Sequence, residues 1–151
     1  MLDRSDLLLR YFGYLVNDFG FELERKQFDP GAMGNAVLVF KSRTVSIEIV
    51  VDRNDVLISI GDPLDRRWDW FEFTDVMKYY APEIPTAYVF PQKTSDNTWD
   101  EMVEIQVDRL SKMLRQYCEP LLKGEPLMKR ELKQIENERV TKRYGKFMDG
   151  S

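Results

Sequence analysis

The stretch Thr44-Val-Ser-Ile-Glu-Ile-Val-Val51 decides the fold class. Its apolar residues at positions 45, 47, 49 and 51 alternate with mostly polar ones, which is typical of a β-strand with one buried face. The polar turn 52–55 follows, and the alternation resumes at positions 56, 58 and 60. Strands joined by so short a turn pair antiparallel. The stretch therefore predicts a β-hairpin with one face in the core.

Two more strands are predicted on the N-terminal side of this hairpin. Residues 36–41 form a nearly continuous apolar run of strand length. Residues 21–28 have the length of a strand that would place Phe21, Leu23 and Arg25 on one face. All these strands are consecutive and their connections are short, so we expect an antiparallel meander of about four strands.

Helices are predicted on both sides of the meander. Residues 3–19 carry apolar side chains at three- and four-residue spacing, and Gly20 follows, where a helix can end in the left-handed conformation. Residues 98–119 form the longest predicted helix, which Pro120 ends, and residues 71–80 form a short one. The fold class is therefore α+β, with an N-terminal helix, the meander, and then helices packed on one sheet face.

The strand alternation and the helix stripes together predict the hydrophobic core. The inward positions of the strands should meet the apolar stripes of the two longer helices. The expected core residues are Phe12, Leu15, Phe19, Leu38, Phe40, Ile47, Ile49, Ile58, Ile60, Met102, Leu110 and Leu114.

Charge is divided unevenly along the 151 residues, whose net charge is −4. Residues 1–122 hold 21 acids and 14 bases, whereas residues 123–146 hold 8 bases and 4 acids. The length suits one domain. We expect a single α+β domain over residues 1–125 and a basic C-terminal helical arm of the same domain over residues 126–151, helical over 127–144.

Three interpretations of this basic arm are open. It can be a solvated helix held by ion pairs, or it can dock on the acidic body of its own chain or of a second copy, which would make a homodimer. It can also lie along nucleic acid. Glu131, Glu136 and Glu138 lie between its bases, and the whole chain is acidic. Both observations argue against a nucleic-acid partner.

Residue counts exclude several classes of active site. The chain has no histidine, which excludes a Ser-His-Asp triad, a Cys-His pair and a histidine metal site. Cys118 is the single cysteine, and it falls near the C-terminal end of a predicted helix, where nothing would lower the pKa of its thiol. Gly31 and Gly34 are too close together for a phosphate-binding loop. We expect no enzyme, no cofactor and no metal.

The most unusual stretch is Asp62-Pro-Leu-Asp-Arg-Arg-Trp-Asp-Trp-Phe-Glu-Phe-Thr-Asp75. Its acids could ligate a metal or act as acid and base, but their spacing does not match an EF-hand. Acids are also common where a helix begins, and the tryptophans could simply pack on the sheet. Tryptophan and arginine are frequent in binding hot spots. The candidates for partner binding are Asp62, Asp65, Arg66, Arg67, Trp68, Asp69, Trp70 and Glu72.

Two further segments carry a resemblance to known proteins. They are Tyr11-Phe-Gly-Tyr-Leu-Val-Asn-Asp-Phe-Gly-Phe21 and Tyr117-Cys-Glu-Pro-Leu-Leu-Lys-Gly-Glu125. With the strands between them, they resemble small bacterial cytosolic proteins of uncharacterised families, some of which are thought to be immunity proteins of polymorphic toxin systems. The resemblance covers the order of elements over most of the chain. It implies an inhibitor-type binding protein without catalytic residues, whose partner is a toxin.

The sequence carries no pattern typical of membrane insertion or secretion. No apolar run approaches the roughly 18 residues of a membrane helix, the first residues do not look like a signal peptide, and a lone cysteine fits a reducing compartment. We expect a cytoplasmic protein with no membrane partner.

The first hypothesis for the function is a non-catalytic protein-binding module, in the manner of an immunity-type inhibitor, that acts through an acidic, aromatic surface. The alternative is a small-molecule-binding domain or minor enzyme with a site between the sheet and the long helix.

Overall fold

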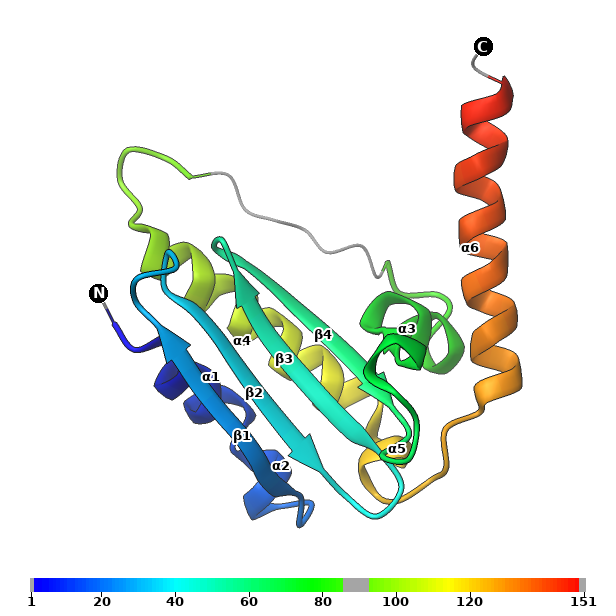
Figure 1. Cartoon of the computed structure of the whole chain (residues 1–151), viewed down its shortest axis with the longest axis horizontal. Coiled ribbons are helices and arrows are strands. Elements are labelled where there is room, and N and C mark those ends of the chain that lie inside the picture. The colour runs from blue at the N-terminus through cyan, green and yellow to red at the C-terminus, as the bar shows by residue number, and fades with distance from the viewer. Residues whose placement is uncertain (1, 86–92, 150–151) are drawn as a thin grey trace.

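A five-stranded antiparallel meander forms the centre of the fold (Figure 1). The computed structural model describes residues 2–85 and 93–149, with side chains as far as residue 143. Each strand pairs with the next one along the chain. The strands are β1 (Glu22–Asp29), β2 (Asn35–Lys41), β3 (Ser46–Asp52), β4 (Asp55–Gly61) and β5 (Phe71–Glu72). The predicted meander is confirmed and gains a short strand, because the chain runs beside β4 before the next helix begins.

One face of the sheet is buried, as the alternation predicts. Ile49 of β3 is fully buried and lies opposite Leu38 of β2 and Ile58 of β4. The same face carries Ile47 and Ile60, which pair with each other and are also fully buried. The core therefore begins as a row of aliphatic side chains that crosses the three central strands.

Helices cover this buried face (Figure 1). Helices α1 and α4 lie against the sheet and against each other, and α3 packs on β4. Their bounds are α1 (Arg4–Phe12), α2 (Tyr14–Asn17), α3 (Phe73–Tyr80), α4 (Trp99–Tyr117), α5 (Glu119–Leu122) and α6 (Lys129–Asp149). The prediction of an α+β fold with helices on one sheet face is thus confirmed.

The first helix differs from its prediction. Residues 3–19 do not form one helix, because the chain turns at Gly13 and a separate short helix, α2, follows. Glycine is a weak helix former, which makes this interruption inexpensive. The ends follow the sequence signals: the Asp3 carboxylate accepts hydrogen bonds from the N–H groups of Ser5 and Asp6, and Gly20 has a φ of +74°.

The predicted core is buried with one exception. Phe19 is only half-buried, because it lies beyond the end of α2. Its ring meets the Tyr14 ring edge to face, with 6.2 Å between the ring centres, and the Arg115 guanidinium lies 5.9 Å from the centre of the Phe19 ring. Phe19 therefore closes the rim of the core and does not fill its centre.

The edge strand β1 contains a bulge that the sequence did not reveal. The register shifts between Leu23 and Arg25, so that Leu23 pairs with Phe40 on the helix side and Arg25 pairs with Val39 on the other side. The prediction that Leu23 and Arg25 share one face is therefore wrong, because the extra residue of a bulge reverses the alternation. Lys26 then points to the helix side, where its ammonium forms an ion pair with Asp6.

No described helix covers the opposite face of the sheet, which faces the viewer in Figure 1. Three aliphatic side chains lie in register across it: Val37 pairs with Val50, and Val50 pairs with Leu57. The two valines are half-buried and Leu57 is exposed. The loop between β4 and β5 borders this face.

Candidate functional site

Helix α6 docks on α3 and on the β4–β5 loop of its own chain. Leu127, just before the helix, and Leu132 within it are buried, and Ile135 is half-buried. Beyond Arg139, which contacts α3, the helix extends away from the rest of the chain (Figure 1). Few apolar side chains anchor α6, so ion pairs must contribute much of its positioning.

Arg139 makes the most buried of these ion pairs. Its Nε and Nη2 atoms donate to the two carboxylate oxygens of Asp75 at 2.9 and 3.0 Å, and Nη2 lies 3.6 Å from Glu72. Asp75 is buried in the first turn of α3. Asp75 raises the pKa of Arg139, which therefore stays charged. A guanidinium that meets a carboxylate through two parallel bonds fixes orientation as well as distance, so this pair sets the angle between α6 and α3.

Lys129 fastens the first turn of α6 to the loop. Its ammonium lies 2.9 Å from a carboxylate oxygen of Asp62 and 2.9 Å from one of Asp65. The N–H of Leu64 and then Lys129 lower the pKa of Asp62, and the two acids raise the pKa of Lys129. The basic arm thus binds the acids of the loop, as one interpretation of the sequence expected.

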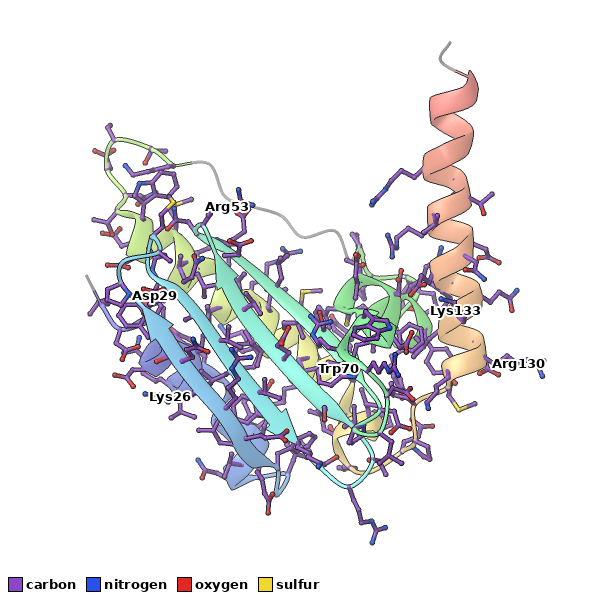
Figure 2. The ribbon with its side chains drawn as sticks, in the orientation of Figure 1. Lys26, Asp29, Arg53, Trp70, Arg130 and Lys133 are labelled. Carbon is purple, nitrogen blue, oxygen red and sulfur yellow. The ribbon has the colours of Figure 1, made fainter. Side chains whose placement is uncertain are left out.

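The inner side of the loop is fixed on the uncovered face of the sheet. Trp70 packs on Gly61, where an added Cβ atom would lie 2.0 Å from the indole ring. Its indole N–H donates to the Asp65 carbonyl at 3.4 Å. Arg67 donates to Glu48 at 2.6 and 2.9 Å and to Ser59 at 2.9 Å. Figure 2 shows Trp70 between the sheet and the base of α6.

The outer side of the loop carries apolar surface into solvent. Leu64 is 94% exposed and Trp68 is 74% exposed. The Arg66 guanidinium stacks over the Trp68 ring, 5.1 Å from its centre. We call Leu64, Arg66 and Trp68 the loop tip. A fixed loop that exposes a leucine and a tryptophan four residues apart is a candidate for an interaction surface.

The structure divides the eight predicted candidates into two groups. Arg66 and Trp68 lie on the outer side, and Asp69 is exposed beside them. The other five make contacts within the chain and position the loop; they are Asp62, Asp65, Arg67, Trp70 and Glu72. Sequence reasoning missed Leu64 as a site residue. The signal for it was an aliphatic residue between Pro63 and Asp65, in a loop whose remaining side chains are charged or aromatic.

Other sequence features have structural roles. Cys118 is fully buried with its Sγ 3.8 Å from the Met77 sulfur, and burial raises the pKa of its thiol to about 12. Over residues 2–85 and 93–149, no group of three or more acid or cysteine side chains is arranged to hold a metal ion. None of the helices in the same ranges is long and apolar enough for a membrane crossing.

The interface between the sheet and α4 is filled by buried side chains. These are Val103, Val107, Leu110 and Leu114 on the helix side.

A hollow of about 460 Å³ lies elsewhere, where the segment after α2, the β2–β3 turn and the α5–α6 connection meet. Its lining includes Asp18, Arg43 and Lys123. Asp18 is paired with Arg115, and Lys123 with Glu119.

Comparison with protein-family models, with curated proteins and with solved structures finds no match to this chain. Function is therefore inferred from the side chains themselves.

The docking of α6 gives a first prediction. Arg139→Leu is expected to lower the free energy of unfolding by about 1–3 kcal/mol, because the buried Asp75 carboxylate loses its partner. The loss is limited, since α6 can undock and let water reach Asp75. Hydrogen exchange should become faster along α6 while the sheet stays protected.

Arg143→Leu is the matched control, because Arg143 is an exposed arginine of the same helix. It should leave both stability and exchange unchanged. Adding Asp75→Asn to Arg139→Leu should recover part of the lost stability, since the buried charge is then gone. Equal exchange along α6 in the wild type and in Arg139→Leu would contradict the role of this pair.

Proposed function

We propose that this chain is a non-catalytic protein-binding module and that the loop tip is the centre of its binding surface. The observation that carries the proposal is the exposure of Leu64 and Trp68 on a loop that is held in place on its other side. Tryptophan and arginine supply much of the binding energy in protein interfaces, and a prepositioned loop loses little entropy on binding.

The surroundings of the loop tip support a surface of useful size. Arg67 joins the loop to Glu48, which lies two residues before Val50 in β3. The aliphatic row Val37, Val50 and Leu57 crosses the same uncovered face. A partner seated on the loop tip could therefore extend over this part of the sheet, with apolar contacts at its centre and polar ones at its rim.

The resemblance to immunity proteins supports a narrower version of the proposal. In that version the partner is a toxin, and binding inhibits it by covering its active site or by holding it in an inactive form. Such an inhibitor needs a stable scaffold and an exposed hot spot, and it needs no catalytic residue of its own. The buried thiol of Cys118, with its raised pKa, fits a chain that performs no thiol chemistry.

A comparison of two tryptophans tests the proposal. Trp68 and Trp99 are both exposed, at 74% and 52%, and each stacks with a base, Arg66 or Lys93. The wild type, Trp68→Ala and Trp99→Ala are used as baits in extracts of the source cell. We expect a specific protein that the wild type and Trp99→Ala retain, and that Trp68→Ala loses by a factor of about ten or more.

The captured protein is then purified and its dissociation constant measured with each variant. Both variants should melt near the wild-type temperature, because both tryptophans are exposed. If all three baits retain the same proteins, or if both variants lose the same ones, the loop tip is not the binding surface.

A further inference from the structure

We propose that the partner of this module presents carboxylate groups to the loop tip, so that the contact surface of the partner is acidic. This inference rests on the proposed function and specifies the chemistry of the partner. It reverses the expectation of an acidic binding surface that the sequence gives for residues 62–72. Three observations lead to it.

The first observation is that α6 pairs with most of the acids of residues 62–75 within the chain. Lys129 pairs with Asp62 and Asp65, and Arg139 pairs with Asp75 and approaches Glu72 at 3.6 Å. Asp69 also lies close enough to Lys133 to raise the pKa of that lysine, although Glu136 contributes more. The acidic character that the sequence indicates is therefore used to hold α6.

The second observation is that the two arginines of the loop have different roles. Arg67 is bonded to Glu48 and Ser59 on the sheet. Arg66 is exposed, and among the described residues its guanidinium contacts the Trp68 ring and forms no ion pair with a carboxylate. Arg66 thus keeps its hydrogen-bond donors for a ligand, and stacking on the ring limits the orientations it can take.

The third observation is that the Arg66 guanidinium stacks on the exposed Trp68 ring, and that the exposed Leu64 lies two residues earlier in the same loop. A guanidinium recognises a planar carboxylate through two parallel hydrogen bonds, and Trp68 and Leu64 fit apolar side chains around it. A polyanion such as nucleic acid is a poor fit, because it is bound through several phosphate contacts and the loop tip supplies a single cation, Arg66. The surface therefore suits a protein segment with Asp or Glu beside apolar residues.

A random peptide library displayed on phage tests the inference, and it does not require that the natural partner be identified. Peptides are selected on the wild-type chain, with Trp68→Ala as the counter-selection. We expect the enriched peptides to contain Asp or Glu next to an aromatic or aliphatic residue. Arg66→Glu should weaken the best peptide by about tenfold or more, and Arg66→Lys should weaken it by less, because lysine keeps the charge but cannot form the paired bonds.

Arg53→Glu is the matched control, since Arg53 is an exposed arginine in the β3–β4 turn, at the opposite end of β4 from the loop. It makes the same change in net charge and should leave peptide binding unchanged. Added salt should weaken binding to the wild type, whereas it should strengthen the residual binding to Arg66→Glu by screening the repulsion between the introduced carboxylate and the peptide acids.

The outcomes separate this inference from the proposed function. Enriched peptides that need Trp68 but lack acids, or that bind Arg66→Glu as well as the wild type, overturn the acidic partner and leave the loop tip as a protein-binding surface. A selection that yields no peptide dependent on Trp68 counts against both. A fluorescent single-stranded oligonucleotide that binds through Trp68 and Arg66 would assign the surface to nucleic acid and overturn the inference.

Discussion

Arg4→Met is expected to lower the free energy of unfolding by about 3 kcal/mol, near the low end of the range for a broken buried ion pair. Arg4 is 1% exposed; its Nε donates to Asp100 at 3.0 Å and its Nη1 donates to the Met33 carbonyl at 3.1 Å. Methionine replaces the apolar stem of the arginine but supplies no donor. Asp100 is 26% exposed, so water compensates part of the loss.

Arg10→Met is the matched control for this prediction. Arg10 also lies on α1 and pairs with an acid of α4, Glu104, at 2.6 Å, but its side chain is 66% exposed. Exposed pairs contribute little, so the loss should stay below about 1 kcal/mol. Urea denaturation of both variants measures the difference. Similar losses for the two would mean that burial of Arg4 does not decide its contribution.

Ile49→Ala is expected to lower the free energy of unfolding by about 2–5 kcal/mol. Ile49 is fully buried at the centre of the sheet, between Leu38 and Ile58, with helices over it. Truncating the side chain to a methyl group there leaves a cavity that close-packed neighbours cannot fill. The urea midpoint should fall while the slope of the transition stays unchanged, because the folded and unfolded states keep their exposed surface.

Val50→Ala is the comparison on the other face of the same strand. Val50 is half-buried between Val37 and Leu57, and no described helix covers it. Its loss should be about 1 kcal/mol or less, mostly from weaker cross-strand contacts. A larger loss at Val50 than at Ile49 would contradict the assignment of the two faces.

The sequence predicts those parts of the fold that depend on local patterns. The alternation over 44–51 places Ile47 and Ile49 in the core, and Gly20 ends the first helical region with a positive φ. The turn at Gly13 and the bulge after Leu23 are not visible in the apolar pattern. They depend on which backbone groups find partners once the elements meet, which is a property of the assembled structure.

The candidate site, too, can be predicted from the sequence only in part. Its composition identifies the loop, because tryptophans, arginines and acids are concentrated there. The charge of the exposed surface could not be predicted, because it depends on pairs such as Lys129–Asp65 and Arg139–Asp75 that are far apart in the sequence. Only after α6 docks is it decided that Arg66 remains available while Asp62, Asp65 and Asp75 are paired.

The bulge in β1 also bears on the solubility of the chain. β1 is the long edge of the sheet, and an exposed edge offers N–H and C=O groups that a strand of another molecule could join to start a fibril. The shift in register after Leu23 interrupts that row of groups, and the ion pair of Lys26 with Asp6 places charge beside it. An incoming strand would meet mismatched hydrogen bonds and would have to desolvate a charged pair. Both features disfavour the addition of a strand from another molecule at this edge.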